Sequence, residues 1–295
     1  MGWKGSIVIG VMVVSLVFLP LGLHFGQKRH DLVTIVLPER PSPDAPRGAS
    51  FAAAAAAIMQ AELDGFTGWR PNDLPPWGPQ LGPDNNASRQ LGILQALRDS
   101  VRVFKDNLTK VSSDEYDANL VQADNLLRND PEKWAFPSAE SRYRNAIERL
   151  HAYGAGLTTD PPKSRPINAR NIDLIRLIQT WTDLLGGAHA NLFGNRVGWF
   201  QLDDVYYQAS GYCHAIAHMI PAIQIEYDRE LQSRKILAQL LAEAQAPLER
   251  CATMKPIVVL NGGDTSVLAN HRRNLDTYVA EARQKLYSVR EELEK

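Results

Sequence analysis

The sequence lacks the motifs that would identify a reaction. It contains two cysteines in 295 residues, Cys213 and Cys251, too few for a cysteine-only zinc site or a disulfide-dense scaffold. It contains no HExxH sequence, so the glutamate base of a zinc metalloprotease is missing. No serine lies in the context of a nucleophile elbow. We therefore expect no particular cofactor, and whether the protein is an enzyme stays open.

The chain also lacks an excess of charge of either sign. Lysine and arginine total 32, and aspartate and glutamate total 33. A protein that binds nucleic acid normally carries a basic excess, so the composition argues against a nucleic-acid partner. Apolar residues make up 44 % of the chain and charged residues 22 %, which is the balance of an ordinary globular protein.

Charge is absent altogether from one long segment. Residues 5–27 form a run of 23 without Asp, Glu, Lys or Arg. As a helix rising ~1.5 Å per residue, this run reaches roughly 35 Å, enough to cross a hydrocarbon core of about 30 Å. A cleaved signal peptide fits less well, because residues 23–26, LHFG, do not form a small-residue cleavage site. The sequence therefore predicts a single transmembrane anchor within residues 1–30.

The charges beside this run leave its orientation open. Lys4 precedes the run, whereas Lys28 and Arg29 follow it, so the positive-inside rule alone does not favour export of the body. A short leader followed directly by an apolar run nevertheless behaves like a signal anchor. We therefore expect the body to lie outside the cytoplasm, in the periplasm.

A linker separates the apolar run from the body. Residues 38–50 read PERPSPDAPRGAS and are rich in proline, arginine and serine. Proline stiffens such a segment and prevents regular structure. We interpret residues 31–50 as a proline-rich tether.

The body is predicted to be all-α, with about eight helices. Leu91, Leu94, Leu97 and Val101 show the spacing of three or four that places apolar side chains on one helical face. Ser50 is suited to cap the first body helix. The proline- and glycine-containing stretch 154–166 is the best internal boundary. It divides the body into helical subdomains at 51–157 and 158–295.

Two histidines mark the first candidate site. His214 and His218 are four residues apart, so they share one face of a helix predicted over 202–229. A metal site needs a third ligand and an orienting second shell, which the local sequence does not provide. The alternative is a buried helix whose imidazoles bond to backbone carbonyls, tyrosines or water. This structural interpretation is preferred.

Three further residues complete a possible ligand site. Tyr207 lies on the side of the helix that carries His214 and His218, and Asn270 and His271 lie at the start of the last predicted helix. If the chain brings all five together, they would form a polar pocket for a ligand. The alternative for His271 is an interior position in the core.

The two cysteines are predicted to form a disulfide. Helices predicted at 202–229 and 233–252 are joined by a turn of a few residues, so they pack antiparallel. The midpoint between Cys213 and Cys251 is residue 232, at the turn, so the two side chains lie at the same height. Two buried free thiols are the alternative.

Several segments together resemble one bacterial family of membrane-anchored proteins, the domain-of-unknown-function 2333 family. The resemblance covers about residues 55–290 and implies a single N-terminal span and a helical body, without implying an activity. The segments that carry it are GFTGWRPNDLPP at 65–76, WAFPSAESRYRNAI at 134–147, ARNIDLI at 169–175, DDVYYQASGYCHAIAH at 203–218 and PIVVLNGGDTSVLANH at 256–271.

Two functions from different classes follow from these observations. The preferred hypothesis is a non-catalytic, single-pass protein of the bacterial inner membrane that holds or recruits a protein partner in the envelope. The alternative is a helical enzyme, or a ligand- or metal-binding module, with its site around Tyr207, His214, His218 and His271. A pocket where these side chains converge would favour the alternative.

Overall fold

The protein is an all-α protein, as the sequence predicted. The computed structural model describes residues 3–15, 32, 34–42, 44–74, 85–110, 116–194, 198, 201–256, 259–263 and 266–295. Within these ranges, the only pairing of extended backbone is an isolated antiparallel bridge between Asn261 and Asn270.

Within the described residues the body contains nine α-helices, close to the eight expected. A π-helical turn, η2 (Phe104–Leu108), continues α4. The helices are α1 (Trp3–Val13), α3 (Ala49–Asp64), α4 (Asn85–Val103), α5 (Ala118–Leu127), α6 (Ala139–Gly156), α7 (Asn171–Phe193), α8 (Leu202–Glu226), α9 (Asp228–Ser233), α10 (Lys235–Thr253) and α11 (His271–Glu294).

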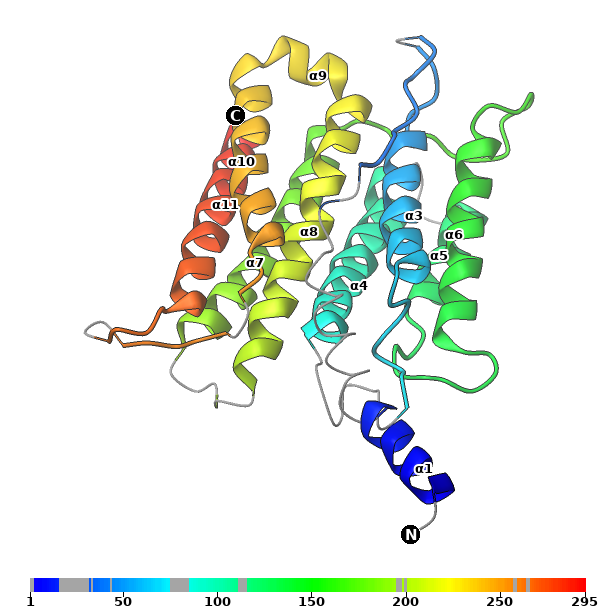
Figure 1. The fold of residues 1–295 in the computed structure, drawn as a ribbon. Helices are drawn as coiled ribbons and strands as arrows, with labels where there is room; N and C mark the ends of the chain where they lie inside the picture. The colour runs from blue at the N-terminus through cyan, green and yellow to red at the C-terminus, as the bar shows by residue number, and fades with distance from the viewer. Residues whose placement is uncertain are drawn as a thin grey trace.

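Helix α8 occupies the centre of the body (Figure 1). It packs against α4, α3, α7 and α10, while α5 and α6 lie on one side and α11 on the other. Its residues 205–225 carry no formal charge, which suits a helix surrounded by other helices. The predicted boundary at residue 157 falls between α6 and α7. However, one hydrophobic cluster contains side chains from both sides of it, so the core is continuous.

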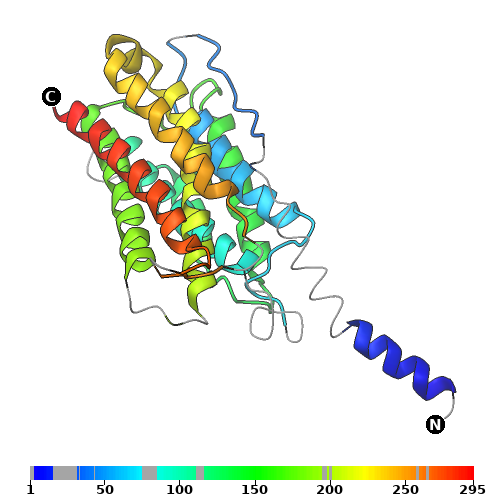
Figure 2. The same cartoon turned by 60° about the vertical axis from the view of Figure 1, so that its left-hand side comes forward.

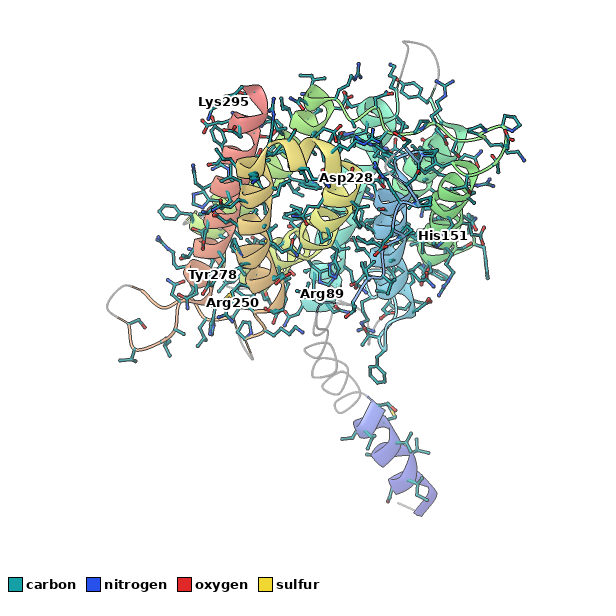
Figure 3. All side chains as sticks on the ribbon, turned by 90° about the horizontal axis from the view of Figure 1, so that it is seen from above. Arg89, His151, Asp228, Arg250, Tyr278 and Lys295 are labelled. Carbon is teal, nitrogen blue, oxygen red and sulfur yellow. The ribbon has the colours of Figure 1, made fainter. Side chains whose placement is uncertain are left out.

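Helix α1 stands apart from the body. It lies beyond one end of the helical bundle (Figures 1 and 2). At this end α3 and α10 finish, and α6 and α11 begin. We call it the α1-side end. Seen from above, Arg89, Arg250 and Tyr278 lie toward α1, whereas Lys295 lies on the far side (Figure 3).

The predicted transmembrane helix is not supported by the described residues. Helix α1 has 11 residues, and within the ranges given above no helix is both long and apolar enough to span a bilayer. Residues 16–27, the remainder of the predicted span, lie outside the described residues.

The backbones of α4 and α8 touch where these two helices cross. This pair makes the most extensive helix–helix contact in the molecule. A Cβ added to Gly211 would lie 2.1 Å from the carbonyl oxygen of Arg89, and one added to Gly92 would lie 2.2 Å from that of Gln208. Both positions therefore require glycine, because a side chain would force the helices apart.

The first turn of α3 is capped by a side chain from the other end of the sequence. The Glu226 carboxylate, at the end of α8, accepts hydrogen bonds from the backbone N–H groups of Gly48 and Ser50 at 2.7 Å and of Phe51 at 3.3 Å. Ser50, the predicted cap, lies inside the helix, whose N-cap is Gly48; the Ser50 hydroxyl donates to the Pro38 carbonyl at 2.8 Å. The anionic carboxylate suits the positive end of a helix.

The described part of the predicted tether is attached to the body. We call residues 34–42 and 44–47 the strap. Arg40 pairs with Asp228 at 3.1 Å, and Arg47 pairs with Glu230 at 2.9 Å. The apolar side chains of the strap, at positions 35 and 37, pack against the core cluster. The sequence suggested a solvated linker; long-range ion pairs and apolar burial, which composition does not reveal, hold the strap on α8 and α9 instead.

We expect Gly211→Ala to destabilise the protein. The new methyl group cannot fit beside Arg89, and overpacking of this kind costs about 1–3 kcal/mol or more. Gly187→Ala on α7 is the matched control, since nothing lies within 4 Å of a Cβ there and alanine favours a helix by up to about 1 kcal/mol over glycine. Thermal unfolding followed by circular dichroism measures both. Equal melting temperatures for the two variants would contradict the backbone contact.

We also expect Glu226→Ala to destabilise the protein strongly. It leaves three buried N–H groups without their acceptor, and each unsatisfied group costs roughly 1–3 kcal/mol, so the loss should be about 3 kcal/mol or more. Glu226→Gln keeps one acceptor oxygen and should lose less. The control is Glu243→Ala, which removes a surface ion pair with Lys285 and should change little. Chemical unfolding of the three variants checks the order.

Candidate functional site

The structure brings two of the five candidate residues into direct proximity. The ring centroids of His214 and His218 are 4.6 Å apart, with the rings inclined by 40°. His214 is buried and His218 is half-buried. The lack of charge along α8 explains this placement, because the helix can bury nearly every side and carries its imidazoles inward with it.

Hydrogen bonding assigns the proton on His218. Its Nδ1 lies 2.8 Å from the carbonyl oxygen of His214. A carbonyl only accepts, so Nδ1 carries the hydrogen and donates. In the neutral ring, Nε2 is then the nitrogen that carries the lone pair. This is the bond to a backbone carbonyl that the structural interpretation expected.

His218 borders a small groove on the surface of the body. The groove has a volume of about 220 Å³ and lies between α8, α10 and the start of the strap. Gln245 in the groove donates to the Ala217 carbonyl at 2.9 Å and to Glu249 at 2.8 Å. The polar residues that line this groove are Thr34, His218, Gln245 and Glu249, while the rest of the lining is apolar: Leu32, Ile35, Leu37, Ala217 and Pro221.

The donor set does not form a metal centre in the part of the chain that the structure describes. Across those residues, no three His, Cys, Asp or Glu side chains lie close enough together to hold one ion. A structural or catalytic zinc site needs at least three such ligands. The paired histidines therefore offer two nitrogen atoms at most, which suits hydrogen bonding better than metal binding.

Tyr207 is held near the α1-side end of α8. Its hydroxyl donates to the Pro256 carbonyl at 3.3 Å, and its ring lies edge-on to Tyr206 at 5.2 Å. Burial, assisted by the nearby negative charge of Asp203, raises the pKa of Tyr207 to about 12. The phenol therefore stays protonated at neutral pH and acts as a hydrogen-bond donor.

Asn270 and His271 organise the turn before α11. Asn270 is the N-cap of the helix: its side-chain oxygen accepts from the Arg273 N–H at 3.0 Å, and its amide donates to the Gly262 carbonyl at 2.6 Å. The Nδ1 atom of His271 accepts from the Leu260 N–H at 3.0 Å, so this imidazole has the opposite tautomer to that of His218. Both side chains use their polar atoms to hold the loop at 260–262.

The sequence did not reveal a buried ion pair between α3 and α4. Arg89 and Glu62 are joined at 2.6 Å with both side chains buried, and Arg89 also donates to Asn86 at 3.0 Å. Gln90 ties the same region to the loop at 65–74 through the Gly68 carbonyl and the Arg70 N–H, both at 2.9 Å. In the sequence, the only sign of this ion pair is that two charged residues occupy positions where the helical pattern predicts burial.

Asp203 and Asp204 occupy the first turn of α8. Asp204 accepts a hydrogen bond from the Ser88 hydroxyl at 2.7 Å and borders a cavity of about 260 Å³ between α4 and α8. Burial raises the pKa of Asp203. Acidic residues in a first helical turn also stabilise the helix dipole, so this pair has a structural role whether or not the cavity binds a ligand.

The two cysteines lie next to each other in the core between α8 and α10. Both are buried and both are free thiols. Burial and the neighbouring Cys213 thiol raise the pKa of the Cys251 thiol, and Cys251 also donates to the Leu275 carbonyl at 3.8 Å. The disulfide itself stays a prediction.

We expect this disulfide to form when the protein matures in an oxidising compartment. Protein prepared without reductant and then denatured should show no reactive thiol by quantitative thiol labelling. Cys213→Ser and Cys251→Ser should each expose one reactive thiol under the same conditions, because each leaves one cysteine without its partner. Two reactive thiols per wild-type chain would show that the bond does not form.

Comparison with known families accounts for the resemblance seen in the sequence. A family model described as "Uncharacterized protein conserved in bacteria (DUF2333)" matches residues 1–193 and 188–295. Comparisons with curated proteins and with solved structures returned no match. The family match covers both the helix that carries the histidine pair and the turn held by Asn270 and His271. The chain therefore belongs to this bacterial DUF2333 family.

Proposed function

We propose that the protein is a non-catalytic scaffold of the bacterial envelope. A single N-terminal helix anchors it in the inner membrane, and its periplasmic body holds a protein partner near the membrane surface. The observation that carries the proposal is the apolar exposure of α1. The side chains of Ile7, Val8 and Val11 in α1, and of Val14 directly after it, are each about half exposed. An apolar helix in this state is stable when lipid surrounds it.

The sequence extends this apolar surface. Residues 16–27 continue the run without a formal charge, so a helix over 5–27 has the length that a bilayer core requires. The strap, at 34–47, then connects the anchor to α3. Its ion pairs with α9 would restrict the motion of the body relative to the membrane.

The scaffold role rests on how the candidate residues use their polar atoms. Tyr207, Asn270 and His271 bond to the chain's own backbone in ways that stabilise turns and helix ends. Such groups are less available for a substrate than unpartnered ones, because binding would first have to break the existing bonds. A rigid body with these features is suited to presenting a surface to another protein.

A ligand-binding module is the second candidate. It is favoured by the groove beside His218, where Gln245 has a buried side-chain oxygen without a hydrogen-bond partner among the described residues. Affinity capture of the full chain from its own membranes separates the two. A stoichiometric protein partner that is retained by His218→Ala supports the scaffold. A small molecule that co-purifies and is lost in His218→Ala supports the module.

We expect the protein to remain in the membrane fraction after an alkaline wash. Replacing Val11 and Val14 together by arginine should release it, because each arginine in a membrane-spanning helix costs about 2.5–3.5 kcal/mol on insertion scales. The double replacement by leucine is the control and should stay in the membrane. Release of the wild-type chain by the wash would contradict the anchor.

The orientation of the protein in the membrane can be tested separately from the anchor. Protease added to intact spheroplasts should degrade the body, because we propose that it faces the periplasm. Degradation that occurs only after lysis would place the body in the cytoplasm and would contradict the proposed location.

A further inference from the structure

The exposed tryptophan and phenylalanine side chains are concentrated at one end of the body. Among the described residues, each tryptophan or phenylalanine that is largely exposed lies at the α1-side end: Phe66, Trp134, Phe136 and Phe193. Phe136 is fully exposed and Phe66 is 85 % exposed. Soluble surfaces rarely gather large apolar side chains in one region unless that region contacts something.

Aliphatic residues extend this surface to a third loop. Leu74 lies with Trp134 and Phe136 at the border of a cavity of about 410 Å³. Val267, fully exposed, and Leu268 project from the turn between α10 and α11. We call the six residues Phe66, Leu74, Trp134, Phe136, Val267 and Leu268 the apolar rim. They come from three separate loops, at 65–74, 130–138 and 266–270, which all lie at the α1-side end (Figure 1).

We propose that the apolar rim rests in the headgroup region of the membrane into which α1 inserts. This inference builds on the proposed anchor and adds a second contact, made by the body itself. The body would then sit directly against the bilayer, with its helices running away from it and α9 at the distal end.

The position of α1 selects lipid as the occupant. The apolar helix leaves from the same end as the rim in both side views (Figures 1 and 2), so a bilayer that receives α1 lies nearest to these loops. The far end carries no largely exposed tryptophan or phenylalanine among the described residues; its exposed apolar side chains include Ile172 and Ile236, at the starts of α7 and α10, and Tyr116, just before α5. Tryptophan and other amphipathic aromatic side chains favour the membrane–water interface.

The arrangement of the rim also suits a flat surface. A helix or peptide partner is normally bound in one groove by closely spaced anchors, whereas the rim is spread over three loops. Its charges are mixed, since Glu132 and Lys133 lie side by side beside Trp134. The contact should therefore depend on apolar insertion more than on anionic lipid, and salt should weaken it little.

The test uses the full-length chain in phosphatidylcholine vesicles, with or without a nitroxide-labelled phosphatidylcholine. The fluorophore nitrobenzoxadiazole is attached to single cysteines introduced by Phe136→Cys and Val267→Cys in the rim. Ile236→Cys is the matched control at the far end, and Val11→Cys reports the anchor. All four side chains are exposed, so the substitutions leave the core intact, and the buried native cysteines do not react in the folded protein.

We expect the labels at 136 and 267 to show blue-shifted emission and several-fold stronger quenching by the nitroxide lipid than the label at 236. Equal quenching at 136, 267 and 236, with strong quenching at 11, would overturn the rim contact and leave the anchor standing. Blue-shifted emission without quenching would show that protein covers the rim and would also overturn the inference. Quenching at 136 and 267 without quenching at 11 would support the rim contact and contradict the anchor.

Discussion

The direct backbone contact between α4 and α8 is the constraint on which the rest of the fold depends. Gly92 and Gly211 let the two helices approach until the carbonyl groups of one touch the other. At this distance α8 becomes the central helix, which α3, α7 and α10 then surround. Its central position explains why His214, His218 and one of the two cysteines are on a helix with so little exposed surface. Steric fit at two glycines thus controls the burial of every candidate group on α8.

A second long-range contact connects the strap to this centre. Glu226 ends α8 and supplies the acceptor for the first N–H groups of α3. Burial raises its pKa, against the effect of the three N–H donors. The ion pairs of Arg40 and Arg47 lie at the same end of α8 and hold the strap beside the cap. The body therefore has a firmly bonded distal end, opposite the end that carries the exposed tryptophan and phenylalanine side chains.

The candidate residues differ in the hydrogen bonds that their side chains make. His218 and His271 are both half-buried imidazoles, yet one donates through Nδ1 to a carbonyl and the other accepts through Nδ1 from an N–H. Only the first faces a groove that is lined by other polar side chains. Residue type alone does not distinguish these two histidines, and hydrogen bonding separates their roles. This is the reason that we propose a scaffold first and keep the groove beside His218 as the site of a second candidate.

The sequence by itself determined the all-α fold, the bounds of the helices predicted at 202–229 and 233–252 to within a few residues, and the proximity of Cys213 to Cys251. These features follow from helical periodicity and from a short turn between adjacent helices, which are local. Periodicity could not reveal that Glu226 caps a helix 176 residues away, that Arg89 and Glu62 pair in the core, or that Asn270 is a cap. Only the tertiary structure decided these, because each depends on which side chains meet when distant segments pack. The same physical reason applies to the apolar rim: its six residues lie on three loops that only the packed helices bring to one end.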